Sequence, residues 1–303
     1  METLNESSYE RSGSLRHATG APVRVLQFGE GNFLRAFADW MFEHLNRQTP
    51  FRGRVRIVQP LPAGRGEALN AQDGLYTVVL RGLDGGQPVT AITTVTCVTG
   101  AVNPFTDWQG FLSEALNPDL RFVISNTTEA GIAYEAIPFP LTKCPESFPA
   151  KVTALLRRRF QQFGNQDGRG LVFLPCELIE ANGDTLKACI LQHARDWGLG
   201  EEFANWVETA CIFANTLVDR IVTGYPEAEA QMFWKSMGYE DRLLVAGELF
   251  HLWVIEGPES LQRELPFHQA GLNVVWTDTL MPYRSRKVRL LNGAHTSGAL
   301  AAY

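Results

Sequence analysis

"VRVLQFGEGNFLRAF", residues 23–37, is the stretch that decides the fold. Its first six residues form a short apolar run that ends at a glycine, which predicts a buried strand. The residues that follow place large apolar side chains at helical spacing: Phe33, Phe37, Trp40, Met41 and Leu45. "RVRIVQP" at 54–60 predicts a second strand, and its distance from the first fits a right-handed parallel crossover.

The remainder of the chain continues the alternation of strands and helices. Further strands are predicted within 120–131, 170–178, 242–257 and 272–278, and helices at 107–117 and 150–163. Residues 74–100 are rich in β-branched side chains around "LDGGQ", which predicts a hairpin inserted into the parallel sheet. We therefore predict an α/β fold of Rossmann type, with a mostly parallel sheet and a β-hairpin insertion. The arginines of the 150–163 helix, Arg157 to Arg159, are expected on its solvated face.

Composition narrows the class of partner. The 303 residues are 45% hydrophobic and 20% charged, as in globular proteins, and the net charge of −6 argues against a nucleic-acid or anionic-membrane partner. The sequence has no apolar run of transmembrane length, and its polar start lacks a secretory signal core. An odd number of scattered cysteines suits reduced thiols in a cytoplasmic protein: Cys97, Cys144, Cys176, Cys189 and Cys211.

Gly29 and Gly31 lie between the first strand and the first helix. The first glycine permits a tight turn, the second lets the backbone approach a pyrophosphate, and the helix start offers N–H groups to it. Leu34 replaces the third glycine of the usual fingerprint, so a plain tight turn is the alternative. The predicted cofactor-binding residues are Leu26, Gln27, Phe28, Gly29, Glu30, Gly31, Asn32, Phe33, Leu34 and Asn126.

Two strand ends bear on the same site. Asn126 ends a strand at the expected cofactor crevice, although a helix cap or a turn is an alternative role. An acid at the end of the second strand would favour NAD through the ribose 2′-hydroxyl. This chain has Gln59 and then Pro60 there, so the rule leaves the choice between NAD and NADP open.

Lys287, Asn292 and His295 form a Lys-x4-Asn-x2-His pattern. On a helix they fall within about 140° of arc, so one face can present all three to a single oxygen atom. A lysine can act as general base, and asparagine and histidine can donate hydrogen bonds to a developing alkoxide. The set suits oxidation of a secondary alcohol without a metal. The spacing alone also fits a surface lysine, a cap-like asparagine and a structural histidine.

Five motifs occur in the order typical of one family: "FGEGNFLRAF", "SNTTEAGI", "PCELIEANGDTLK", "NTLVDRIVTGYP" and "KVRLLNGAHT". From about residue 22 to about 298 the chain thus resembles the mannitol dehydrogenase-like family of polyol-specific long-chain dehydrogenases. The resemblance implies a Rossmann domain followed by a helical domain, with NAD as cofactor and no catalytic metal. Together with "QDGLYTVVLRG", it implies interconversion of the hexonate D-altronate and the hexuronate D-tagaturonate. Sibling activities on fructuronate or mannitol, and a dinucleotide-binding module without turnover, are the alternatives.

The resemblance also implies roles for single residues. Lys287 would be the general base, and Asn292 and His295 would hold the reacting oxygen. Asn182, in "NGD", and Asp219, in "VDR", match positions that line the substrate or orient the catalytic face. Turn chemistry is the alternative for Asn182, and an ion pair with Arg220 is the alternative for Asp219.

The expected domain organisation follows from the same comparison. Residues 1–20 are expected to be a flexible tail, 21–279 the dinucleotide-binding domain, and 280–303 the first helix of a truncated C-terminal helical substrate domain. The family continues well past its Lys-x4-Asn-x2-His helix, whereas this sequence ends eight residues after His295. We expect a continuation of the chain or a second polypeptide to supply the remainder. Candidate cations for a substrate carboxylate are Arg284, Arg286 and Arg289.

Overall fold

A six-stranded parallel sheet forms the centre of the computed structural model, which describes residues 1–11, 18–128, 130–140 and 142–287. Its strands are β1 (Val23–Phe28), β2 (Arg54–Val58), β5 (Val98–Val102), β6 (Phe122–Ser125), β7 (Val172–Pro175) and β8 (Ile212–Phe213). Their order is β5-β2-β1-β6-β7-β8, and each neighbouring pair is parallel. The chain thus winds away from β1 in both directions, which confirms the predicted Rossmann sheet.

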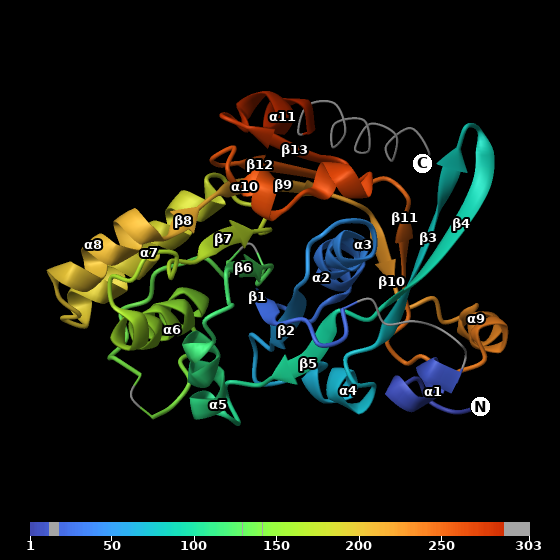
Figure 1. The fold of residues 1–303 in the computed structure, drawn as a ribbon, viewed down its shortest axis with the longest axis horizontal. Helices are drawn as coiled ribbons and strands as arrows, with labels where there is room; N and C mark the ends of the chain where they lie inside the picture. Colours follow the sequence, from blue (N-terminus) through green and yellow to red (C-terminus); the bar gives the residue numbers. More distant parts are fainter. Residues whose placement is uncertain (12–17, 129, 141, 288–303) are drawn as a thin grey trace, which may run out of the picture.

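Helices cover both faces of this sheet (Figure 1). Val25 of β1 belongs to one apolar cluster with Phe37, Met41 and Leu45 of the first helical run. Leu26 of β1 points the other way, into a second cluster with residues of α6 (Phe148–Phe163), α7 (Asn182–Asp196) and α8 (Glu201–Ala210). Opposite burial of neighbouring residues follows from the two-residue period of a strand. Two apolar faces on one strand explain why the sequence there reads as a continuous hydrophobic run.

The first helical run is unbroken from residue 32 to residue 48, in three parts. α2 (Asn32–Leu34) leads into a π-helical turn, η1 (Arg35–Asp39), and then into α3 (Trp40–Gln48). Such wide turns occur frequently at functional sites. Here the turn places the ionisable side chains of Arg35 and Asp39 in the interior. The helix that the apolar spacing predicted is therefore confirmed, with one irregular turn.

The predicted hairpin is confirmed, but its place in the fold differs from the prediction. β3 (Tyr76–Asp84) and β4 (Gln87–Val95) are antiparallel and joined by Gly85 and Gly86, both with positive φ, as a type I′ turn requires. The hairpin is not an insertion in the parallel sheet. It pairs through β11 (Val245–Glu248) with β10 (Val222–Gly224) to form a separate four-stranded sheet. Strand patterns show which residues are extended but not which distant strand completes their hydrogen bonds.

A third sheet has the order β13-β12-β9, with β9 (Asn215–Asp219) antiparallel and β13 (Val274–Thr277) parallel to the central β12 (Leu252–Glu256). It carries the end of β9 toward α11 (Met281–Arg286), as Figure 1 shows at the top of the view. The other helices are short: α4 (Gly66–Ala71), α5 (Trp108–Ser113), η2 (Glu114–Leu116), α9 (Ala230–Met237), α10 (Leu261–Glu264) and η3 (Phe267–Ala270). The sequence-predicted strands at 242–257 and 272–278 are thus confirmed.

Residues 1–11 are docked on the domain, which corrects the expectation of a flexible tail over 1–20. Leu4 is fully buried, and its backbone N–H donates to the carbonyl oxygen of Glu240. α1 (Glu6–Arg11) places Tyr9 in a small apolar cluster with Leu4, Leu75 and Tyr239. Burial of Leu4 and Tyr9 and backbone hydrogen bonds with Glu240 hold this mostly polar segment on the domain.

Arg159 also departs from expectation, because it is buried and not on a solvated face. Its guanidinium donates to the carbonyl oxygens of Ala115, Asn117, Leu120 and Arg169, which end neighbouring loops. A guanidinium group has five N–H donors in one plane, so it can bond several carbonyl oxygens at once. Desolvation lowers the pKa of Arg159 to about 10.

Two further observations concern the chain as a whole. All five cysteines are buried and free. Within the described residues, none of the helices combines the length and the apolar character that a membrane span requires.

Candidate functional site

A cavity of about 420 Å³ lies where the carboxyl ends of β1, β2 and β6 meet. Its lining comes from the glycine turn, from the loops after β2 and β6, and from the start of α6: Gly29, Glu30, Gly31, Pro60, Leu61, Asn126, Thr127, Thr128, Ala130, Gly131, Ala133, Glu135, Glu146, Ser147 and Phe148. In open α/β sheets, ligands bind at the point where the strand order reverses, and β1 is that point here.

The backbone requires glycine at only one of the two glycine positions of the turn. Gly29 has φ 127°, and a Cβ there would lie 3.1 Å from both Asn126 O and Leu34 Cδ1, so the fold itself requires glycine. Gly31 has an ordinary φ of −67°, and a Cβ there would meet nothing within 4 Å. The fold therefore tolerates a side chain at Gly31, and the open space beside it faces the cavity that it lines. A backbone left bare at a helix start suits close approach by a pyrophosphate.

The predicted cofactor residues divide into lining and supporting groups. Gly29, Glu30, Gly31 and Asn126 line the cavity. Leu26, Gln27, Phe28 and Leu34 are buried, whereas Asn32 and Phe33 are half-buried at the start of the helical run. The buried apolar residues support the turn from both sides: Leu26 and Phe28 belong to β1, and Leu34 belongs to α2.

Gln27 connects the turn to a buried acid. Its amide nitrogen donates both to Gly29 O and to Asp39 Oδ2, each at 3.1 Å, and the Tyr76 hydroxyl donates to the same carboxylate oxygen at 2.7 Å. Asp39 Oδ1 and Gln27 Oε1 are buried without a hydrogen-bond partner among the residues that the structure describes. Desolvation raises the pKa of Asp39 to about 7, against the two donors that lower it. The interior thus favours a proton on this carboxyl group.

Asn126 ties three strand ends together. Its backbone N–H donates to Phe28 O and its amide nitrogen to Cys176 O, both at 3.0 Å. Beside it, the buried Glu177 carboxylate accepts from Ser125 Oγ at 3.0 Å and from the backbone N–H of Thr127 at 2.9 Å. Desolvation raises the pKa of Glu177. Thr127 and Glu177 are not among the residues predicted from the sequence, although Thr127 lies in a polar run and Glu177 is an acid just after a buried strand.

Lys287 and Asp219, predicted as general base and substrate-side residue, lie together. Lys287 follows α11, and its Nζ lies 3.3 Å from Asp219 Oδ1 and 2.5 Å from Val218 O at the end of β9. Both side chains are mostly buried, at 15% and 16% exposure. Arg220, the alternative partner considered for Asp219, instead donates to the carbonyl oxygens of Ala36, Leu249 and Phe250. Asn292 and His295 lie outside the described residues.

The side chain of Asn182 links β7 and β9 by hydrogen bonds to the backbone of both strands. Its amide nitrogen is 3.0 Å from each of the carbonyl oxygens of Pro175, Glu177 and Thr216. Its carbonyl oxygen accepts from the backbone N–H groups of Gly183 and Thr216. The side chain is 1% exposed, and its donors and acceptor are all committed to the backbone. Asn182 therefore joins the end of β7 to the start of β9, the strand whose other end contacts Lys287.

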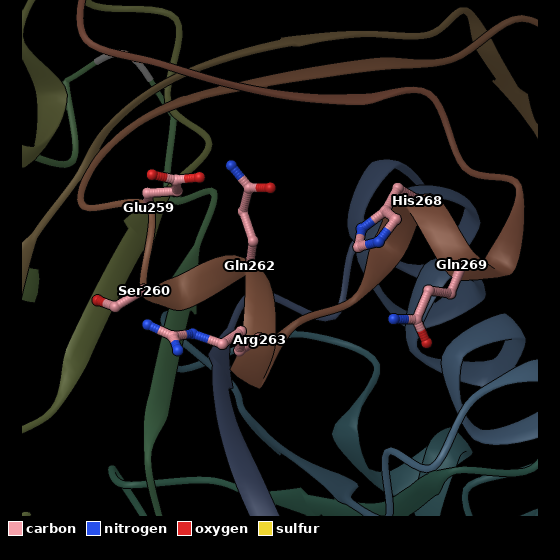
Figure 2. Close-up of a pocket in the computed structure, with 6 residues that line it drawn as sticks. All are labelled: Glu259, Ser260, Gln262, Arg263, His268 and Gln269. Carbon is pink, nitrogen blue, oxygen red and sulfur yellow. The ribbon is translucent and has the colours of Figure 1, made fainter.

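A separate cavity of about 410 Å³ lies on α10 and η3 (Figure 2). Its six lining side chains come from one short stretch: Glu259, Ser260, Gln262, Arg263, His268 and Gln269. α10 is anchored by an ion pair between Glu264 and Arg121, and Arg121 directly precedes β6. This cavity is thus at the amino ends of the parallel strands, whereas ligands of such sheets bind at the carboxyl ends. We assign the function to the cavity at the glycine turn.

Known proteins of similar sequence and fold identify the family. The family model for the mannitol dehydrogenase Rossmann domain matches residues 23–269. The chain belongs to this family. Similar family members include altronate oxidoreductases of Phocaeicola vulgatus (46% identical over 307 residues, 100% of this chain and 62% of the relative), Bacteroides thetaiotaomicron (46% over 286 residues, 93% and 59%) and Escherichia coli O7:K1 (44% over 298 residues, 98% and 60%). The chain spans about three fifths of the length of these curated relatives.

Solved structures of the family share the fold. A substrate-free D-sorbitol dehydrogenase superposes with a TM-score of 0.73 at 22% identity, covering 97% of this chain and 62% of that one. A Pseudomonas fluorescens mannitol 2-dehydrogenase, in a ternary complex with NAD and D-mannitol, gives a TM-score of 0.74 at 19% identity, with 97% and 61% covered. At these identities the likeness shows the fold alone.

Proposed function

We propose that the chain carries the cofactor site and the proton-transfer lysine of an NAD(H)-dependent oxidoreductase that interconverts D-altronate and D-tagaturonate. The observation that carries the proposal is the cavity at the switch point of the parallel sheet, into which the bare backbone of Gly31 opens. The choice of sugar acid is supported by relatives of 43% to 46% identity that are named altronate oxidoreductase.

The residues around the cavity fit a dinucleotide. The helical run that begins after Gly31 offers N–H groups to a pyrophosphate, and Asn126 borders the same space. When bound, NAD supplies the acceptor or donor of a hydride. The mannitol 2-dehydrogenase of similar fold has been solved with NAD, which supports this choice of cofactor.

Lys287 is proposed to move the proton. Val218 O accepts a hydrogen bond from its ammonium group, and the Asp219 carboxylate forms an ion pair with it. In reduction the ammonium gives its proton to the forming alkoxide, and in oxidation the amine takes the proton back from the hydroxyl group. Asn292 and His295 are proposed to hold the reacting oxygen, and Asn182 to position β9 beneath Lys287.

The substrate side of the site is proposed to need more than the described residues. Arg284 and Arg286 of α11 are candidate cations for the substrate carboxylate, together with Arg289, which lies outside the described residues. We propose that a further helical segment, from a continuation of the chain or from a second polypeptide, closes over the substrate and excludes water. The family relatives are long enough to carry such a segment.

The test is NADH oxidation by the purified protein with D-tagaturonate, D-fructuronate and D-fructose in parallel. The proposal expects the highest kcat/KM with D-tagaturonate. Preference for D-fructuronate would move the assignment to the sibling uronate reductase, and turnover with D-fructose alone would contradict any uronate assignment. NADH binding without turnover on all three would favour a dinucleotide-binding module.

A further inference from the structure

The end of β2 lacks the acid that usually selects NAD, and Gln59, which stands there, is occupied elsewhere. Its side chain is buried, and its amide nitrogen donates to Leu61 O at 2.8 Å and to Pro62 O at 3.1 Å. Its carbonyl oxygen accepts from the backbone N–H of Gly66 at 3.1 Å. Gln59 therefore shapes the loop after β2 from within, and both N–H groups of its amide are committed to carbonyl oxygens of that loop.

Glu30 brings a carboxylate to this loop from the glycine turn. Its Oε1 accepts from the backbone N–H of Arg65 at 3.3 Å, and a Cβ added at Gly64 would overlap the same oxygen. Glu30 also lines the cavity, together with Pro60 and Leu61 of the loop. The carboxylate thus lies against the segment that follows β2, where an acid at the end of β2 would otherwise meet the adenine ribose.

We propose that Glu30 selects NAD over NADP, in place of the acid missing from β2; this inference rests on the proposed dinucleotide site. A carboxylate accepts hydrogen bonds from the 2′- and 3′-hydroxyls of the ribose, and these hydroxyls replace the water that it loses. The 2′-phosphate of NADP would bring a second anion to the same half-buried position, where repulsion is screened less than in water.

The surroundings of Glu30 are consistent with this role. Desolvation raises the pKa of Glu30, while the N–H of Arg65 and the charges of Arg35 and Arg65 lower it in part. The protein therefore offsets only part of the desolvation of the Glu30 carboxylate. Hydrogen bonds from the hydroxyl groups of a ligand would stabilise the carboxylate further. The exposed Arg65 side chain is the nearby cation that a 2′-phosphate would meet once the charge of Glu30 is removed.

The experiment measures the Kd of NADH and of NADPH by titration, for wild type, Glu30→Gln, Glu30→Ala and Glu30→Gln/Arg65→Ala. Glu67→Gln is the matched control, since it removes an exposed carboxylate just beyond Arg65. Wild type is expected to prefer NADH. Both Glu30 variants are expected to lower the ratio of the NADPH Kd to the NADH Kd by about tenfold or more, the effect of one charge-assisted contact. The double variant should lose the gain in NADPH binding.

Two negative results are distinguishable. If wild type binds NADH but the ratio is the same in Glu30→Gln, Glu30→Ala and wild type, Glu30 is not the selecting residue, whereas the dinucleotide site stands. An equal change in Glu67→Gln would likewise overturn the inference, because general charge would then explain the effect. If folded wild type binds neither nucleotide, the proposed function fails and the inference fails with it.

Discussion

Lys287 Nζ lies 3.3 Å from Asp219 Oδ1, which joins a residue at the end of α11 to the end of β9. The pair is mostly buried, so water screens its interaction less than that of a surface pair. The same nitrogen donates a hydrogen bond to Val218 O, which orients the Lys287 side chain toward the end of β9. The contact supports the proposal that Asp219 orients Lys287, the proposed general base.

Lys287→Ala is expected to lower kcat for NADH oxidation with D-tagaturonate by about 10²–10⁴-fold, the usual contribution of a general acid–base group. The Kd of NADH should change little, because the Lys287 side chain lies against the end of β9 and Lys287 does not line the cavity at the glycine turn. Lys235→Ala, which removes an exposed lysine from α9, is the control. Near-normal turnover in Lys287→Ala would show that another group moves the proton.

Asp219→Asn is expected to lower kcat by about tenfold or more while the protein stays folded, since it removes the charge that holds the ammonium group but keeps the side-chain shape. Steady-state kinetics and a thermal melt of the same preparation check this. In the Lys287→Ala background the second substitution should add little, because the two groups act together. Additive losses would mean that Asp219 acts independently of Lys287.

Asn182→Ala is expected to destabilise the fold by about 3 kcal/mol, because it leaves buried backbone groups of β7 and β9 unsatisfied. Urea unfolding measures the effect. Asn205→Ala, at an exposed position of α8, is the control and should stay within about 0.5 kcal/mol of wild type. If Asn182→Ala changed the free energy of unfolding as little as the control, the hydrogen bonds of Asn182 would not hold β7 and β9 together.

Asp39→Asn tests the buried acid behind the glycine turn. Burial raises the pKa of Asp39 to about 7, above its value of about 3.9 in an unfolded chain. The folded state therefore holds the proton more tightly, and this contribution to stability is full below about pH 4 and is lost as the pH rises toward about 7. Asparagine mimics the protonated acid at all pH values.

The free energy of unfolding of Asp39→Asn relative to wild type is thus expected to rise between about pH 4 and about pH 8, by at most about 4 kcal/mol. Urea unfolding of both proteins at several pH values measures it, and the difference between them cancels groups that titrate alike in both. Parallel profiles would show that Asp39 is ionised in the folded protein.

The sequence was sufficient for the elements whose signals are local. The strand–glycine–helix unit at Gly29 and Gly31 and the hairpin turn at Gly85 and Gly86 follow from spacing and turn chemistry alone. The pairing of β3 with β11 could not be predicted, because the partner strand is far away in the sequence and any extended edge offers the same backbone groups.

Side-chain roles followed the same division. Asn182 was singled out as a substrate residue, yet its contacts are with backbone groups of two strands that meet only in the folded chain. Gln59 at the end of β2 left the nucleotide preference open, and the relevant acid, Glu30, comes from a different element. Burial of Arg159 likewise depends on carbonyl groups that loops bring together from outside its helix. Spacing within one element carries none of this information.

The most direct test of the dinucleotide site compares NADH binding by wild type and Gly31→Ala. A methyl group at Gly31 meets no atom of the described residues within 4 Å, so the variant should melt like wild type, whereas Gly29→Ala should be destabilised by its positive φ and by Asn126 O. Gly31→Ala is expected to weaken NADH binding by about tenfold or more, because the methyl group occupies the approach of the pyrophosphate. Unchanged NADH affinity in folded Gly31→Ala would contradict it.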